Sequence, residues 1–176
     1  EREKLLEKLA AEGGDYACSA AKCDLLFDNL KASLDAADAK KFNAAFDSLL
    51  GLAKGGFQAA AVKLAFFIET NCGKIKNFRD AAAELPALYG ILSHASKEME
   101  FYQMKRGEAL AKRGDWKGAM KILRPLAEKF LAREKFSAAQ SLARFTSGNF
   151  YGEAKSAAFV AHAYRDGLGI EANPAK

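Results

Sequence analysis

Apolar residues recur along most of this chain at the three- and four-residue spacing of amphipathic helices. Gly-Gly pairs and Pro- or Asn-containing stretches separate these segments. No segment keeps the two-residue alternation of a strand, so we expect an all-α protein of eight to ten helices with short loops. Helices are predicted for residues 1–12, 16–35, 38–54, 57–70, 78–84, 86–95, 96–113, 115–129, 136–147 and 154–166, followed by a terminal loop over 167–174.

The clearest turn signal is Gly114-Asp115. Gly114 can end one helix by taking a positive φ, and Asp115 can cap the next helix through its free N–H groups. Trp116 is large enough to wedge two antiparallel helices, and Ala119 is small where their backbones pass closely. The apolar face then continues through Leu123, Leu126 and Ala127, so this stretch predicts a helical hairpin.

An earlier helix has the same kind of beginning, because Asp38 can cap it. Its buried side is predicted to hold Phe42, Ala45, Phe46, Leu49 and Leu52. The following segment, 57–70, is nearly all apolar, so we expect it to be covered on several sides and to end at Asn71-Cys72-Gly73. Pro86 is expected either to open the next helix or to kink one.

Composition supports the helical prediction and limits the function classes. Half of the residues are hydrophobic, and Val, Ile and Thr are sparse. The net charge is +5, but like charges form no run of five or six, so a mixed solvated surface is favoured over a nucleic-acid-binding face. No stretch approaches about 20 apolar residues, so no membrane span is predicted. The chain begins at Glu1 without a signal peptide, and we expect it to be part of a longer or processed chain.

Three cysteines, Cys18, Cys23 and Cys72, leave two interpretations open. Either Cys72 forms a disulfide with Cys18 or Cys23, or all three are small buried hydrophobic residues. No metal site is predicted, since His94 and His162 have no ligand partner at a useful spacing. No phosphate loop or catalytic motif is present, so no cofactor and no enzymatic activity are expected.

Two segments share a pattern of Ala, Leu four residues on, Leu-Ala three residues further, a break and an Ala-rich helix that closes on Leu-Ala. The first begins at Ala45 and the second at Ala119, an offset of 119 − 45 = 74 residues, or twice 37. A period in the thirties is the size of one helical hairpin in stacked arrays. The segment 130–136 is an insertion that lengthens one connection.

Residues 97–129 resemble a tetratricopeptide hairpin, because Gly107, Gly114-Asp115-Trp116 and Ala119 fall at its spacing. The segment 158–170 resembles the Sel-one-like subclass, with a small residue, Tyr164 and then Gly167-Leu168-Gly169-Ile170. Together the resemblance covers roughly residues 40–176. It implies an α-solenoid, a right-handed superhelix of antiparallel helical hairpins, with residues 1–40 as N-terminal capping helices, 41–176 as the repeats and an array that continues past the C-terminus.

The resemblance also implies where a partner binds. The first helix of each hairpin lines the concave side, which in such repeats binds peptides or whole proteins. Position by position, this predicts a partner-binding face of Phe101, Met104, Glu108, Lys112, Gln140, Arg144, His162 and Arg165. The alternatives are ordinary core for Phe101 and Met104, solvated charge for Arg144 and Arg165, and a structural histidine for His162.

We therefore expect a non-enzymatic scaffold or adaptor that binds another protein or peptide. Members of the resembled family often serve as adaptors in bacterial signalling, envelope assembly or host-directed secretion, and the residues here do not choose among these roles. They do not fix the location either, although a periplasmic or secreted one is slightly favoured over a cytoplasmic one. The alternative is a basic helical repeat that binds nucleic acid, and it is suggested by the isoelectric point near 9.1.

Overall fold

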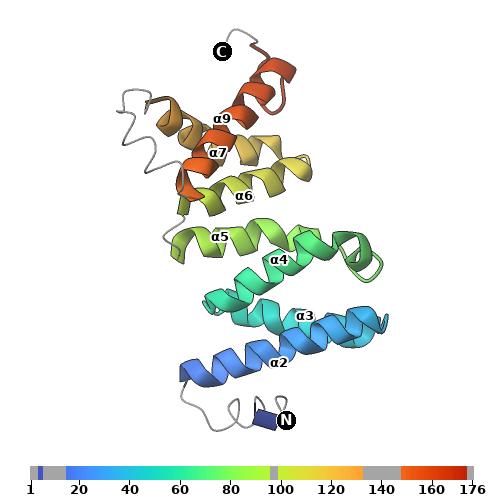
Figure 1. Ribbon diagram of the computed structural model, residues 1–176. Coiled ribbons are helices and arrows are strands. Elements are labelled where there is room, and N and C mark those ends of the chain that lie inside the picture. The colour runs from blue at the N-terminus through green and yellow to red at the C-terminus, as the bar shows by residue number, and fades with distance from the viewer. Residues whose placement is uncertain (1–3, 6–14, 96–98, 133–147, 174–176) are drawn as a thin grey trace. The chain divides into compact units, whose positions relative to one another are not determined.

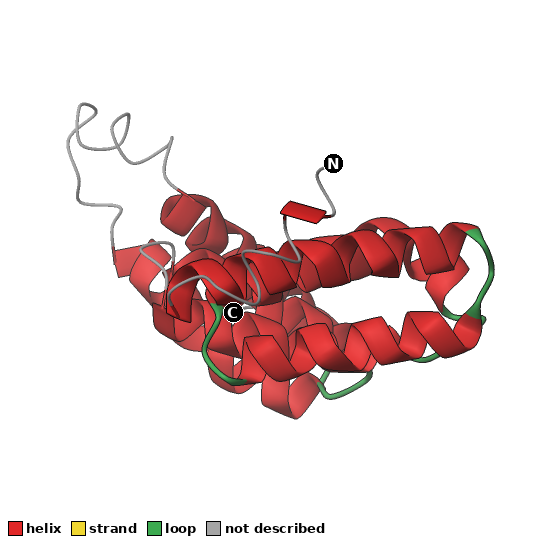
Figure 2. Cartoon of the chain, turned by 90° about the horizontal axis from the view of Figure 1, so that it is seen from below, coloured by secondary structure: helices red, strands yellow, loops and turns green. Residues whose placement is uncertain are grey.

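The computed structural model describes residues 4–5, 15–95, 99–132 and 148–173 (Figure 1). Every regular element in these ranges is a helix and none is a strand, which confirms the all-α prediction (Figure 2). The elements are α2 (Asp15–Asp35), α3 (Ala39–Lys54), α4 (Gln58–Ile75), the 3₁₀ helix η1 (Ala81–Glu84), α5 (Leu85–Ala95), α6 (Met99–Lys112), α7 (Trp116–Ala132) and α9 (Gly148–Asp166).

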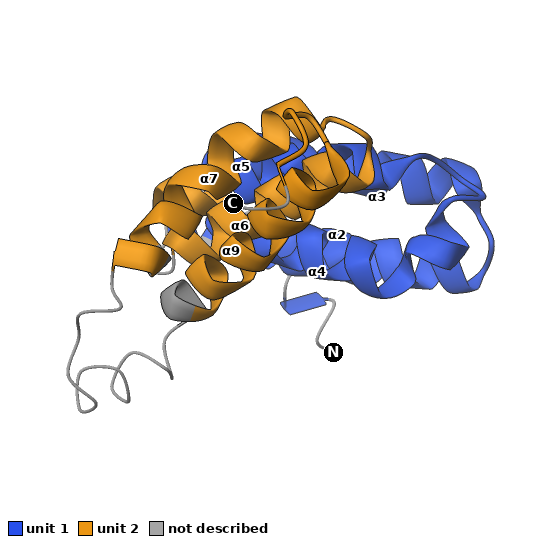
Figure 3. Cartoon of the chain, turned by 90° about the horizontal axis from the view of Figure 1, so that it is seen from above, with its two compact units in different colours: residues 1–91 blue, residues 92–176 orange. Residues whose placement is uncertain are grey.

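The chain forms two compact units, residues 1–91 and 92–176, which divide within α5 (Figure 3). Each unit is built on three helices that pack pairwise: α2, α3 and α4 in the first, and α6, α7 and α9 in the second. This division groups helices by contact, whereas the predicted division at residue 40 followed the repeat pattern. The capping and repeat segments therefore stay a prediction.

The core of the first unit is aromatic. Phe42 is completely buried, and its ring stacks on Phe78 with centroids 5.1 Å apart. The rings of Phe46 and Phe67 lie 5.9 and 6.5 Å from it. The guanidinium of Arg79 covers the outer side of Phe46 at 4.2 Å. Four aromatic rings thus join α3, α4 and the segment after α4, and each contributes a large apolar area.

The second unit relies on close approach between helices. Its core consists of Met104, Ala111, Ala119, Met120, Leu123, Leu126, Ala127, Val160 and Ala163. A side chain at Gly107 would overlap Leu123, and one at Gly152 would lie 2.8 Å from the carbonyl oxygen of Glu100. These two glycines let α7 and α9 pack directly on the backbone of α6.

The two predicted caps are confirmed, and they mark turns of the same kind. The Lys41 N–H donates to Asp38 Oδ1 at 3.0 Å, and the Gly118 N–H donates to Asp115 Oδ1 at 2.8 Å. Each aspartate follows a residue in the left-handed region, Ala37 at φ +54° and Gly114 at φ +83°. The N–H of each aspartate also donates to the carbonyl five residues earlier, as in a Schellman motif.

Aligning the two hairpins on these caps gives an offset of 115 − 38 = 77 residues, compared with 74 from the apolar pattern. At the cap offset Phe42, Phe46, Leu49 and Leu50 correspond to Ala119, Leu123, Leu126 and Ala127, and all eight are buried. The apolar pattern is three residues out of step because a three-residue shift along a helix returns to nearly the same face.

The predicted end of the fourth helix is wrong. Helix α4 continues through Asn71-Cys72-Gly73 to Ile75. Gly73 keeps a helical backbone with a negative φ, and Ile75 is 1% exposed. Burial of the Ile75 side chain offsets the cost of about 1 kcal/mol for a glycine inside a helix. As expected, several elements cover this helix, namely α2, α3 and η1, but one side stays open, where Val62 and Phe66 remain 45% and 66% exposed.

Other boundaries differ in smaller ways. Pro86 is the second residue of α5, so it opens this helix and does not kink it. The helix predicted over 78–84 is reduced to η1, because Phe78 stacks on Phe42 and lies outside any helix. Helix α9 begins at Gly148, six residues before the predicted start. The helix predicted over 136–147 and most of that over 1–12 lie outside the described residues.

Candidate binding grooves

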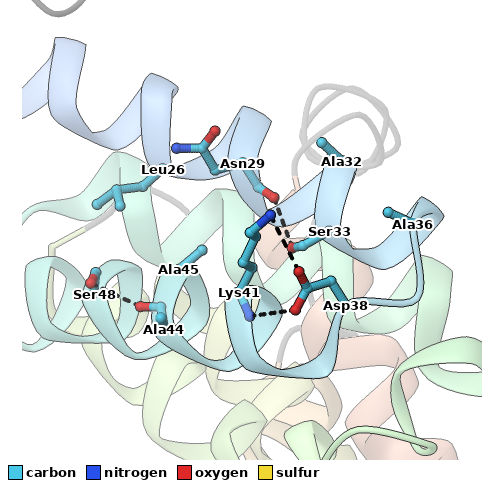
Figure 4. A pocket seen from close by; sticks show the side chains of 10 residues that line it. All are labelled: Leu26, Asn29, Ala32, Ser33, Ala36, Asp38, Lys41, Ala44, Ala45 and Ser48. Atoms are coloured by element: carbon cyan, nitrogen blue, oxygen red, sulfur yellow. Dashed lines mark hydrogen bonds and ion pairs between the residues drawn. The ribbon is translucent and has the colours of Figure 1, made fainter.

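A groove of about 620 Å³ lies between α2 and α3 in the first unit (Figure 4). Small side chains from both helices face it, and alanines at four of these positions leave space that larger residues would fill. The lining residues are Leu26, Asn29, Ala32, Ser33, Ala36, Asp38, Lys41, Ala44, Ala45 and Ser48.

Most polar groups in the α2–α3 groove already have intramolecular partners. The Ser33 hydroxyl donates to the carbonyls of Asn29 and Leu30 at 2.8 and 3.0 Å, and the Ser48 hydroxyl donates to Ala44 at 2.9 Å. Asp38 caps α3 and pairs with the Lys41 ammonium at 3.4 Å. The cap holds the pKa of Asp38 below its ordinary value of 3.8. This groove therefore offers apolar contact and few hydrogen bonds.

A second groove, of about 320 Å³, lies between α7 and α9 in the second unit. Its lining residues are Arg124, Ala127, Glu128, Leu131, Ala157, Val160, Ala161 and Tyr164. Ala127 and Val160 are buried and belong to or border the core, whereas Leu131 and Ala161 are exposed. The apolar floor of this groove is thus continuous with the core, and charged side chains stand only on the α7 side.

Positive charge borders the α7–α9 groove. Lys117, Lys121 and Arg124 follow each other at four- and three-residue spacing, so they share one face of α7, and all three are exposed. We call these three residues the basic stripe. They contribute to an excess in residues 92–176, which hold 15 Lys and Arg against 9 Asp and Glu, whereas residues 1–91 hold 12 against 13.

The structure buries two residues of the predicted partner-binding face and leaves three others exposed. Met104 is completely buried in the core and Glu108 is 5% exposed, so neither presents a side chain to a partner in this structure. Phe101 is half-buried and packs against the same core. The physical reason is that α9 packs on both α6 and α7 and covers this side of α6. Lys112 is exposed at the end of α6, and Gln140 and Arg144 lie outside the described residues.

Glu108 instead holds α9 onto α6. Its carboxylate accepts from the Lys155 ammonium at 2.8 Å, and the side chain of Glu108 is 6% exposed against 40% for Lys155. The hydrogen bond to Glu108 raises the pKa of Lys155 above its ordinary value of 10.5. A lysine with a raised pKa stabilises the fold fully below pH 10.5, and this contribution is lost as the pH rises through the folded-state pKa.

We expect Lys155→Met to lower the free energy of unfolding by about 1–3 kcal/mol at pH 7, because it leaves the Glu108 carboxylate buried without its cation. Lys63→Met is the control, since the Lys63–Asp24 pair between α4 and α2 is solvated on both sides and should cost less than about 1 kcal/mol. Urea unfolding measures both. The difference in free energy of unfolding between wild type and Lys155→Met should narrow above pH 10.5, where Lys155 loses its charge. If Lys155→Met and Lys63→Met lose equal amounts of this free energy, burial of Glu108 does not strengthen the ion pair.

His162 and Arg165 are exposed and form a local network at the end of α9. Arg165 donates to Asp166 at 2.7 Å and approaches His162 Nδ1 at 2.7 Å, and the same Nδ1 lies 2.9 Å from Asp166. The hydrogen bond from Arg165 holds the pKa of Asp166 below its ordinary value of 3.8. The His162 ring also meets Trp116 edge-on at 6.4 Å. These contacts suit a structural role beside the loop, where Gly169 lies directly against the backbone of Trp116.

The three cysteines match neither the predicted disulfide nor the alternative in which all three are buried. Cys23 is buried, and its burial raises the pKa of the thiol above 9.0, whereas Cys72 is exposed on α4. Neither forms a disulfide in the structure, and Cys18 is half-buried. Across the described ranges, no group of His, Cys, Asp and Glu is arranged to hold a metal ion. No helix in those ranges is long and apolar enough to span a membrane.

The sequence reasoning missed the residues of both grooves. Ala127, Ala157 and Ala161 lie in Ala-rich helices, where nothing distinguishes a groove from a core position. The basic stripe did carry a signal in its four- and three-residue spacing, but glycine and apolar residues separate its three cations, so it forms no run of like charges. Comparison of the chain with family models, with curated proteins and with solved structures finds no match in any of the three.

Proposed function

We propose that this chain is a non-enzymatic module that binds another protein or peptide, and that the α7–α9 groove is its binding site. The observation that carries the proposal is an apolar floor open to solvent between two helices, with Leu131 exposed at its edge. Exposed apolar surface framed by charged residues is typical of interaction sites. An apolar side chain from a partner would bury the area that the groove leaves in water.

We further propose that the hairpins belong to an α-solenoid of Sel-one-like or tetratricopeptide-like repeats. In support, the Ala37-Asp38 and Gly114-Asp115 turns use the same aspartate cap, and in each the residue before the aspartate has a left-handed backbone. In each unit a third helix packs on both helices of the preceding hairpin, as stacked repeats require.

The dimensions of the α7–α9 groove suit a short peptide segment. Its lining positions run from 124 to 131 on α7 and from 157 to 164 on α9, so it is about 10 Å long at the helical rise of about 1.5 Å per residue. That length matches two turns of a partner helix or about three residues of extended chain. A volume of about 320 Å³ is at the small end of ligand sites.

The test is to fill the groove without touching the core. Ala161 is exposed and lines the groove, whereas Ala158 is exposed on the same helix and does not line it. We expect Ala161→Phe to reduce the enrichment of binders from a displayed random 12-residue peptide library about tenfold, because the ring occupies the anchor position, while Ala158→Phe enriches binders as wild type does. Equal enrichment by both variants, or no enrichment by wild type, would overturn the proposal.

Nucleic-acid binding is the second candidate, and the cationic excess of residues 92–176 favours it. It requires an affinity for a DNA or RNA oligonucleotide that falls by orders of magnitude between about 50 and 200 mM salt. The proposed peptide site, with its apolar floor, should bind its ligand with a weaker salt dependence.

A further inference from the structure

We propose that the partner segment of the α7–α9 groove is acidic, with an apolar anchor in the groove and carboxylates placed over Lys117 and Lys121. This inference rests on the proposed function and names the chemistry of the partner. The groove and the basic stripe meet at Arg124, which belongs to both. A ligand that fills the groove therefore lies beside the stripe.

The charges of Lys117 and Lys121 are not compensated by described residues of the protein. Lys117 and Lys121 are exposed on the stripe, and neither forms an ion pair with a residue that the structure describes. Arg124 donates to Glu128 at 3.1 Å, so part of its charge is already compensated. A ligand carboxylate placed over the lysines forms an ion pair with them. A cationic side chain placed there is repelled, so the stripe discriminates against basic ligands.

The positions along α7 set the spacing of the ligand. The middle of the groove lies near residue 127, six residues from Lys121 and ten from Lys117. At about 1.5 Å per residue these separations are about 9 and 15 Å. An extended peptide covers them in about three and five residues, so the expected ligand has one large apolar residue with Asp or Glu about three and five positions away.

This combination favours a peptide over a nucleic acid. An apolar floor next to two lysines is complementary to a ligand that carries one apolar side chain and a few carboxylates. A nucleic acid presents a continuous row of phosphates and is bound by cations spread along its backbone. Exposed pairs of charges are worth little individually, so the stripe is expected to set specificity and the groove to supply anchoring.

The experiment repeats the peptide selection with Lys117→Glu/Lys121→Glu and with Lys112→Glu as the matched control. Lys112 is an exposed lysine of the same unit, on α6 and outside the stripe. Glutamate at 117 lies in the first turn of α7, where negative charge is favourable, and glutamate at the exposed position 121 is a good helix former, so the double variant should fold. Circular dichroism checks this before the selection.

We expect wild type and Lys112→Glu to enrich peptides rich in Asp and Glu around a Leu, Phe or Trp. The double variant should enrich neutral or basic peptides and bind a wild-type-selected acidic peptide about tenfold more weakly by fluorescence anisotropy. That affinity should also fall modestly with salt in the wild type and less in the double variant.

Three results overturn the inference. The selected peptides carry no acidic excess; the double variant binds the selected peptide within about twofold of wild type; or a single-stranded oligonucleotide displaces the peptide from the stripe. If the second result occurs while Ala161→Phe still blocks binding, the acidic partner is wrong and the groove function stands. If Lys112→Glu is the variant that loses binding, the face predicted from the repeats replaces the groove.

Discussion

Phe42→Ala is expected to lower the free energy of unfolding of residues 1–91 by about 3–5 kcal/mol, the largest effect we predict for a single substitution. Phe42 is completely buried and its ring contacts those of Phe46, Phe67 and Phe78. Removing the ring loses its transfer free energy and leaves a cavity that three other rings cannot close without leaving their own positions.

Phe66→Ala is the matched control, because the same atoms are removed from a side chain that is 66% exposed on α4. Its expected effect is below about 1 kcal/mol. Urea unfolding followed by circular dichroism measures both variants. A loss at Phe66 comparable to that at Phe42 would show that the exposed face of α4 is covered in solution, and a small loss at Phe42 would refute the aromatic core.

Gly152→Ala is expected to destabilise residues 92–176 by about 2–3 kcal/mol. The added Cβ would lie 2.8 Å from the Glu100 carbonyl oxygen and 2.9 Å from the Phe101 Cα. Both are backbone atoms of α6, which cannot rotate away as a side chain could. Helices α6 and α9 must therefore separate, and the Lys155–Glu108 ion pair between them is expected to lengthen.

The control variant, Gly51→Ala, should change stability in the opposite direction. Gly51→Ala places the same methyl group within α3, where no atom lies within 4 Å. Alanine there restricts the unfolded chain and suits the helix, so we expect a gain of about 0.5–1 kcal/mol. Thermal unfolding of both variants tests the pair, and a neutral Gly152→Ala would show that α6 and α9 do not cross this closely.

The hairpins could be predicted from the sequence because their causes are local. Asp38 and Asp115 cap the residues that follow them, and Gly114 takes the positive φ that it alone can take without strain. The buried positions from Phe42 to Leu49 and from Ala119 to Ala127 also follow from helical spacing.

The proposed binding face could not be predicted in the same way, because it depends on which helix packs over the exposed side of each hairpin. The repeat resemblance placed Met104 and Glu108 on an open face, but α9 arrives from about 40 residues later in the chain and covers them. The local signal for this cover was Gly152, whose missing side chain permits the crossing, yet a glycine in a sequence does not say what approaches it. Likewise, an alanine that lines a groove looks the same as one that packs a core.

The backbone of Ala37 has a consequence for recognising helical hairpins from sequence. It takes a left-handed conformation at φ +54° that costs a residue with a Cβ about 1–2 kcal/mol, and the hairpin forms nonetheless. A pattern that demands glycine at every inter-helix corner would therefore count one hairpin fewer than this chain folds. Asp38 and Asp115 mark the starts of α3 and α7 alike, whereas α4 begins at a corner with Gly56 at φ +96° and no side-chain cap, so an acidic start and a glycine corner each find helices that the other misses.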